Sequence, residues 1–232
     1  MIAENLTNVK NNIKEACMKA GRDVSEVTLV AVSKMKPNKD ILEAYDAGIR
    51  VFGENYVQEL AEKMEELPDD IKWHMIGHLQ RNKVKYIVGR VDMIHSVDSR
   101  RLAQEISERS LKLGKVTDIL AQINMAGEES KFGLRPDEAT DFAIAVSEMK
   151  GIRLRGLMTS APFVEDAEKN RNIFRSMKDL SVDIMKKNID NVLMDTLSMG
   201  MTADYKVAIE EGATLVRVGT AVFGERNYGG LR

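Results

Sequence analysis

The sequence has one cysteine among its 232 residues, Cys17, so no disulfide bond can form within the chain. A lone thiol suits a reducing compartment, and residues 1–21 lack the apolar centre of a signal peptide. We therefore expect a cytoplasmic protein. The chain also lacks an excess of charge of one sign, because it has 34 basic and 36 acidic residues and a formal net charge of −2. Without a basic field or an apolar run of the roughly 20 residues that cross a bilayer, we expect neither nucleic acid nor a membrane as a partner.

Histidine is scarce as well, with three in the chain. His74 and His78 fall in one predicted strand, where four residues separate them by about 13 Å. That separation is too large for both to reach one metal ion at about 2 Å, and His95 falls in the next strand. We expect no metal site, a structural role for His74, and a place near a pocket for His78. The sequence also contains no Walker-type phosphate loop.

The pattern of apolar residues predicts one helix followed by eight strand-and-helix units. The first helix has one apolar face, which carries Cys17 as a core residue, and ends at Gly21. Strands are expected at residues 27–33, 49–55, 73–79, 92–99, 118–125, 154–162, 194–200 and 214–224. Helices are expected at residues 39–47 and 57–67, from Gln80, at 101–113, from Pro136, and at 165–187 and 203–211, with none assigned after the eighth strand.

Apolar strands that alternate with helices indicate a parallel sheet, and eight units in one chain indicate a single (β/α)₈ barrel with an extra N-terminal helix, covering residues 1–232. A doubly wound open sheet is the alternative. We favour the barrel because no G-x-G-x-x-G sequence follows the first strand. In such a barrel the reactive groups lie where the strands end.

Lys34 follows the first strand, in "VTLVAVSKMKP". The two-residue period of a strand places it on the face of Val30 and Val32, so its side chain is expected to point into the barrel. A desolvated lysine loses its proton easily and forms imines with carbonyl compounds. The alternative is a lysine that extends from the strand end into solvent.

Strands seven and eight end in turns that could bind an anion. Ser198 and a glycine end strand seven, and Thr202 stands at the expected start of the next helix; Gly219 and Thr220 form a second such turn. The loops after these two strands carry the phosphate site in many (β/α)₈ barrels. Arg217 interrupts the apolar eighth strand, where it would need either a carboxylate partner or a bound ligand.

A lysine, an arginine and a phosphate-binding cradle in these positions would suit pyridoxal 5′-phosphate. The chain also resembles the pyridoxal phosphate homeostasis proteins, whose fold is similar to the N-terminal barrel of alanine racemase. The resemblance covers nearly the whole chain, in the blocks "AVSKMKP", "FGENYVQE", "WHMIGHLQRNK", "IHSVD", "KFG" at 131–133, "RGLMT", "LSMGMTADYKVAIEEGAT" and "RVGTAVFGER".

The resemblance implies roles for particular residues. Lys34 would be the Schiff-base lysine, Arg217 would contact the pyridine nitrogen, and Asn55 would lie near the cofactor ring. The residues implied to surround the phosphate are Ser198, Gly200, Met201, Gly219 and Thr220.

Members of that family handle the cofactor without an established catalytic reaction, and apoenzymes that depend on pyridoxal phosphate are candidate recipients. A charged arginine would discourage protonation of the ring nitrogen, which makes the ring a poorer electron sink. We expect a monomer that carries the cofactor. The alternatives are a small amino-acid racemase, for which Tyr205 or Tyr228 could supply a second base, and a different phosphate-binding barrel enzyme.

Overall fold

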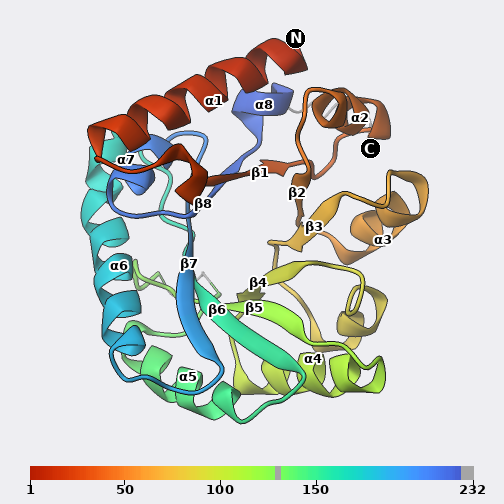
Figure 1. Cartoon of the computed structure of the whole chain (residues 1–232), viewed down its shortest axis with the longest axis vertical. Coiled ribbons are helices and arrows are strands. Elements are labelled where there is room, and N and C mark those ends of the chain that lie inside the picture. The colour runs from red at the N-terminus through yellow and green to blue at the C-terminus, as the bar shows by residue number, and fades with distance from the viewer. Residues whose placement is uncertain (129–131, 226–232) are drawn as a thin grey trace.

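The structure of the chain, a computed structural model, describes residues 1–128 and 132–225. Eight parallel strands close into a barrel in the order of the chain, with helices around the outside (Figure 1). The strands are β1 (Thr28–Val32), β2 (Val51–Glu54), β3 (Lys72–Met75), β4 (Met93–Val97), β5 (Thr117–Gln122), β6 (Ile152–Met158), β7 (Val192–Met201) and β8 (Leu215–Val218).

The helices follow the strands as the sequence predicts; α5 and α6 each begin with a 3₁₀ turn, and the segment between β3 and β4 is a 3₁₀ helix rather than an α-helix. The α-helices are α1 (Ile2–Lys19), α2 (Asn38–Asp46), α3 (Val57–Glu66), α4 (Arg100–Lys112), α5 (Ala139–Ser147), α6 (Arg171–Met185), α7 (Tyr205–Glu210) and α8 (Thr220–Phe223). The 3₁₀ segments are η1 (Val24–Glu26), η2 (Arg81–Tyr86), η3 (Pro136–Glu138) and η4 (Ala167–Asn170).

The pairing of the first strand with the last one closes the barrel. On one side Ala31 of β1 lies opposite Phe52 of β2, and on the other side Val30 lies opposite Arg217 of β8. The prediction of a (β/α)₈ barrel is therefore confirmed, and the open doubly wound sheet is excluded. Closure also brings the end of β1, where Lys34 follows, next to the strand that carries Arg217.

Two apolar layers hold the barrel together. The larger one lies between the strands and the helices and includes Phe52, Phe142 and Phe174, which are fully or almost fully buried. A smaller cluster, made of Val30, Met93, Leu120, Met158 and Leu215, fills the barrel interior. This arrangement follows from the alternation of side chains along a strand, because successive residues face the helices and the interior in turn.

Helix α1 lies outside the barrel beside α7 and α8 (Figure 1). Its apolar face is buried, and Cys17 on that face is fully buried, as the sequence predicts. Burial raises the pKa of the Cys17 thiol. At the other end of the helix, the Asn5 side chain donates a hydrogen bond of 3.0 Å to the carbonyl oxygen of Val222 in α8. The extra helix thus holds the last turn of the barrel in place.

Three local predictions need correction. The helix expected from about residue 203 begins at Tyr205, because the Asp204 carboxylate accepts the amide of Met201 at 2.7 Å and closes a turn there. Strand β3 ends at Met75, so His78 lies beyond the strand rather than on it. A short helix, α8, follows the eighth strand, where none was assigned.

None of the helices in the described ranges is both long and apolar enough to cross a membrane.

Candidate functional site

A cavity of about 550 Å³ opens at the carboxyl ends of the strands. Six of the eight residues predicted for the site line it, namely Lys34, Asn55, Met201, Arg217, Gly219 and Thr220. The remaining lining residues are Val32, Ile76, Gly77, His78, Gln122, Phe132, Met158, Ser160, Pro162, Phe163, Val164, Thr202, Ala203 and Asp204. The strands of the barrel therefore gather at one end the polar groups that the sequence spreads over almost 190 residues.

Lys34 lies in the turn after β1, two residues past the end of the strand, and is half-buried. It lines the cavity together with Val32, as the alternation of side chains along the strand predicts. Asn55 follows β2, and its side-chain Oδ1 is buried without a hydrogen-bond partner. A buried acceptor without a partner is costly. A bound ligand that offers a donor would satisfy it.

Arg217 lies on the floor of the cavity and is 5% exposed. Its Nη1 donates to Ser198 Oγ at 2.5 Å, and its Nη2 donates to the carbonyl oxygen of Thr159 at 2.9 Å. Burial lowers the pKa of the guanidinium to about 10, an effect that the negative charge of Asp204 opposes. No described residue forms an ion pair with Arg217. The carboxylate partner that the sequence left open for this arginine is therefore not observed among the described residues.

A buried chain of hydrogen bonds continues from Ser198 across the barrel interior. Ser198 Oγ lies 2.9 Å from His95 Nδ1, and His95 Nε2 lies 2.9 Å from His74 Nδ1. Burial lowers the pKa of His74 to about 4 and holds that of His95 well below its usual value. Both rings are therefore neutral at pH 7. The prediction that His74 is structural is consistent with its place here, and the described residues contain no cluster of ligands that could hold a metal ion.

The turns after β7 and β8 form one wall of the cavity, next to the loop that carries Lys34. Within the described ranges, the backbone amides of Ala203 and Thr220 have no hydrogen-bond acceptor. The amide of Met201, by contrast, is taken by Asp204. Asp204 is itself fixed, because Asn170 donates to its Oδ2 at 2.8 Å. The wall thus presents free amide donors from two neighbouring loops, an arrangement that suits an anion.

Two of the predicted site residues, Ser198 and Gly200, do not line the cavity. Ser198 is fully buried beneath Arg217 and acts on the site through that residue. Gly200 has a φ of 88°, and a Cβ atom there would lie 2.6 Å from the Cβ of Ala208 and 2.9 Å from the Cα of Tyr205. Glycine at this position lets α7 pack closely against the end of β7.

The outer rim of the cavity includes aromatic residues that the sequence reasoning missed. His78 lines the cavity as predicted, and its ring stacks on that of Phe132, with ring centroids 3.7 Å apart. His78 Nδ1 also lies 3.5 Å from a carboxylate oxygen of Asp98. Phe132 and Phe163 are exposed, the latter at 86%. Phe132 belongs to the "KFG" block noted above, but nothing in its spacing indicated a contact with His78.

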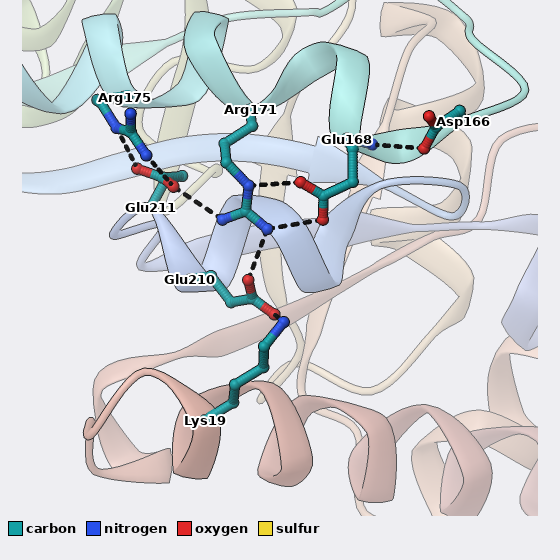
Figure 2. Close-up of polar contacts among 7 residues, drawn as sticks. All are labelled: Lys19, Asp166, Glu168, Arg171, Arg175, Glu210 and Glu211. Atoms are coloured by element: carbon teal, nitrogen blue, oxygen red, sulfur yellow. Dashed lines mark hydrogen bonds and ion pairs between the residues drawn. The ribbon is translucent and has the colours of Figure 1, made fainter.

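An ion-pair network joins α6, α7 and α1 (Figure 2). Arg171 at the start of α6 contacts three carboxylates at 2.6 to 2.8 Å, those of Glu168, Glu210 and Glu211. The network extends through Glu210 to Lys19 of α1 at 2.7 Å, and through Glu211 to Arg175 at 3.1 Å. It holds the C-terminal end of α7, and so fixes the short helix whose other end begins at the Asp204 turn.

The barrel and its cavity belong to a recognisable class. The family model described as "Alanine racemase, N-terminal domain" matches residues 5–227. The alanine racemase of Corynebacterium glutamicum shares the fold, with a TM-score of 0.69 and 16% identity over 100% of this chain and 62% of that one.

Relatives of higher identity narrow the class. A pyridoxal phosphate homeostasis protein of Aquifex aeolicus is 44% identical over 226 residues, which is 97% of this chain and 98% of the relative. The chain therefore belongs to the pyridoxal phosphate homeostasis protein family, whose members carry the alanine racemase N-terminal barrel. A solved relative, PipY of Synechococcus elongatus with pyridoxal phosphate bound, is 34% identical, with a TM-score of 0.81 over 97% of this chain and 100% of that one.

Proposed function

We propose that the chain binds pyridoxal 5′-phosphate in the barrel cavity, covalently through Lys34, and serves in the homeostasis of this cofactor. The observation that carries the proposal is the meeting of Lys34, Arg217 and two free backbone amides in one cavity. The bound cofactor in PipY and the names of the relatives support it.

The residues around the cavity fit such a ligand part by part. The free amides of Ala203 and Thr220, beside Gly219, suit the phosphate group, which accepts hydrogen bonds on every oxygen. The unpartnered Asn55 Oδ1 suits a donor on the ring. Met201 lines the cavity but its amide is taken by Asp204, and Ser198 and Gly200 do not line the cavity but support residues that do.

Arg217 is the reason to propose a carrier rather than a catalyst. The pyridine ring supplies an electron sink when its nitrogen is protonated. Arg217 is a donor at every nitrogen, and its pKa of about 10 keeps it charged at pH 7. A charged donor facing the ring nitrogen holds that nitrogen unprotonated, because two cations repel each other.

The test is to locate the covalent bond. The purified protein, incubated with pyridoxal 5′-phosphate and reduced with borohydride, is expected to carry the added mass on Lys34 and to lose it in Lys34→Ala. Peptide mapping by mass spectrometry identifies the modified residue. A wild-type protein in which Lys34 remains unmodified would reject the proposal. So would a Lys34→Ala variant that retains the yellow colour and the full affinity of the wild type.

A small racemase on the same barrel is the second candidate, favoured by the racemase fold and by a histidine in the cavity. Of the tyrosines considered as a second base, Tyr205 is 4% exposed and does not line the cavity, while Tyr228 lies outside the described residues. Among the described residues, the titratable groups that line the cavity are those of Lys34, Arg217, Asp204 and His78, and His78 lies close to Asp98. His78 is therefore the candidate for a second base. Exchange of the α-proton of alanine or serine in deuterated water, abolished by His78→Gln, would support a racemase; its absence leaves the carrier.

We also propose that the carrier acts as a cytoplasmic monomer and passes the cofactor to apoenzymes. Recovery of activity by an apoenzyme mixed with the loaded protein, at a rate that depends on the concentration of the loaded protein, would support direct delivery. A rate equal to that of spontaneous release would support release into solution.

A further inference from the structure

A buried lysine lies close to Lys34 without facing the cavity. Lys63 belongs to α3, and its side chain is 6% exposed. Its ammonium group donates to three acceptors: the carbonyl oxygen of Ser33 at 2.8 Å, Glu54 Oε1 at 2.7 Å and Glu59 Oε1 at 2.6 Å. Because an ammonium group has three N–H donors, Lys63 is fully satisfied.

The same cluster holds the residues on both sides of Lys34. On one side, the Ser33 hydroxyl donates to Glu54 Oε1 at 2.6 Å, and the Ser33 carbonyl accepts from Lys63. On the other side, the amide of Met35 donates to Glu59 Oε1 at 2.6 Å. Lys34 is therefore the middle residue of the tripeptide Ser33–Met35, and both ends of this tripeptide are connected to the Lys63 ammonium group. Ser33 contacts it directly, and Met35 is connected to it through the Glu59 carboxylate.

The backbone between these ties is in an unfavourable conformation. Met35 has a φ of 59°, in the left-handed region that residues with a Cβ atom rarely adopt. Such a conformation persists only where the surroundings impose it. Here the hydrogen bond from Met35 to Glu59, and the ion pair from Glu59 to Lys63, supply that constraint.

The composition of the cluster does not suit a purely stabilising role. Glu54 is fully buried, and its Oε2 has no hydrogen-bond partner. Burial raises the pKa of Glu54, although the positive charge of Lys63 opposes that effect. A buried ion pair with an unsatisfied oxygen is often no more stabilising than apolar side chains of the same size. Its contacts converge on the turn that carries Lys34.

We propose that Lys63 is a positioning residue that directs the Lys34 amine into the cavity for bond formation with an aldehyde. This inference rests on the proposed function. In the reaction, Lys34 Nζ forms a bond to the aldehyde carbon, and the carbonyl oxygen leaves as water with the two protons of the neutral amine. Lys63 does not react itself, since all its donors are occupied by protein acceptors and it does not line the cavity.

The experiment separates bond formation from binding. Wild type and Lys63→Met are mixed with pyridoxal 5′-phosphate and quenched with borohydride at successive times, and mass spectrometry gives the modified fraction of Lys34. The affinity for pyridoxine 5′-phosphate, an alcohol that cannot condense with an amine, is measured in parallel. We expect the rate at Lys34 to fall about tenfold or more in Lys63→Met, because small misplacements of a reacting group have effects of that size. The affinity for the alcohol is expected to stay within about twofold.

Matched variants keep the test decisive. Lys39→Met removes an exposed lysine of α2, and Glu62→Ala removes an exposed glutamate of α3; both are expected to behave as wild type. Glu59→Ala, at a side chain that is 24% exposed, removes the tie to Met35 and is expected to slow modification of Lys34 as Lys63→Met does. If Lys63→Met fails to fold, Glu59→Ala decides by the same two measurements.

Two results would overturn the inference. One is an unchanged rate of Lys34 modification in the folded variants. The other is an equal loss of modification and of affinity for the alcohol, which would make the cluster a general support of the cavity. A wild-type protein that acquires no mass on Lys34 would instead reject the proposed function itself.

Discussion

At the scale of single residues, Arg217 keeps a charge inside the barrel with neutral partners among the described residues. Ser198 accepts one of its N–H groups, so the serine hydroxyl is free to donate its own proton to His95 Nδ1. That assignment leaves the proton of His95 on Nε2, from which it is donated to His74 Nδ1. Each dipole along the chain then points its negative end toward the guanidinium, which stabilises the buried cation.

The histidine pair should make the stability of the protein depend on pH. The pKa of His74 is lowered from 6.5 to about 4, so the unfolded chain binds a proton more readily than the folded one. The free energy of unfolding is then unaffected by His74 above about pH 6.5 and falls as the pH drops from there toward 4. The loss amounts to about 3 kcal/mol for this residue. Urea unfolding at pH 7 and pH 4.5 measures it, and His74→Gln should reduce the difference; an equal difference in that variant would contradict the assignment.

Gly200 allows a prediction about close packing. Gly200→Ala adds a methyl group 2.6 Å from Ala208 and also places an alanine at a φ of 88°. We expect a loss of about 2 to 4 kcal/mol in the free energy of unfolding. Gly21→Ala is the matched control, because Gly21 has a φ of 64° with no atom near the added methyl group, and should lose only about 1 kcal/mol. Equal losses in chemical denaturation would show that crowding at Gly200 is unimportant.

At the scale of elements, the sequence predicts the orientation of Lys34 after β1 correctly but places the start of α7 wrongly. Strand alternation places Lys34 in the cavity correctly because it depends only on neighbouring residues. The start of α7 was predicted two residues too early, because the turn is closed by the Asp204 side chain, which competes with helix formation. The Lys63 cluster was not predicted, since it joins β1, β2 and α3 through contacts that have no local pattern.

The network around Arg171 (Figure 2) should stabilise α7 and the wall of the cavity. Burial tends to raise the pKa of Glu211, but hydrogen bonds from Arg175 and Arg171 hold it below its usual value. Arg171→Met leaves Glu210 and Glu211 side by side without their shared cation. We expect a loss of about 1 to 3 kcal/mol in the free energy of unfolding, measured in urea at low salt, and a smaller loss at high salt.

The control for that prediction is Arg135→Met, which removes an exposed pair with Asp137, where both side chains are about 70% exposed. Exposed pairs contribute little, so this variant should stay within about 0.5 kcal/mol of wild type. If the two variants lost the same amount, the network of Arg171 would be no more than a set of surface pairs.

At the scale of the whole molecule, the site forms where the two ends of the barrel meet. Lys34 follows β1, and Arg217 lies on β8, which pairs with β1 and closes the barrel. A ligand held by both should therefore stabilise the entire fold. Pyridoxal 5′-phosphate at 100 times its dissociation constant should raise the free energy of unfolding by about 2.7 kcal/mol. Unfolding followed by cofactor absorbance and by circular dichroism should coincide; release of the cofactor well before loss of secondary structure would show that the wall opens on its own.

The barrel architecture was predictable from the sequence because the alternation of apolar strands and helices recurs eight times. An error in one unit leaves the pattern in the other units unchanged. The chain of His74, His95, Ser198 and Arg217 was not, since these residues come from four strands and meet only inside the closed barrel. From the sequence, Arg217 could have had either a carboxylate partner or a bound ligand. The sequence could not show that a serine and a backbone carbonyl would take part of that role.

The tie between the first loop and the last helix has a consequence during synthesis. Lys36 Nζ donates to the carbonyl oxygens of Phe223, Gly224 and Glu225 at 2.9 to 3.3 Å, across about 187 residues of sequence. The lysine loop can therefore meet its final neighbours only after residues 223–225 have left the ribosome. A nascent chain that has not reached these residues is expected to bind no vitamin B6.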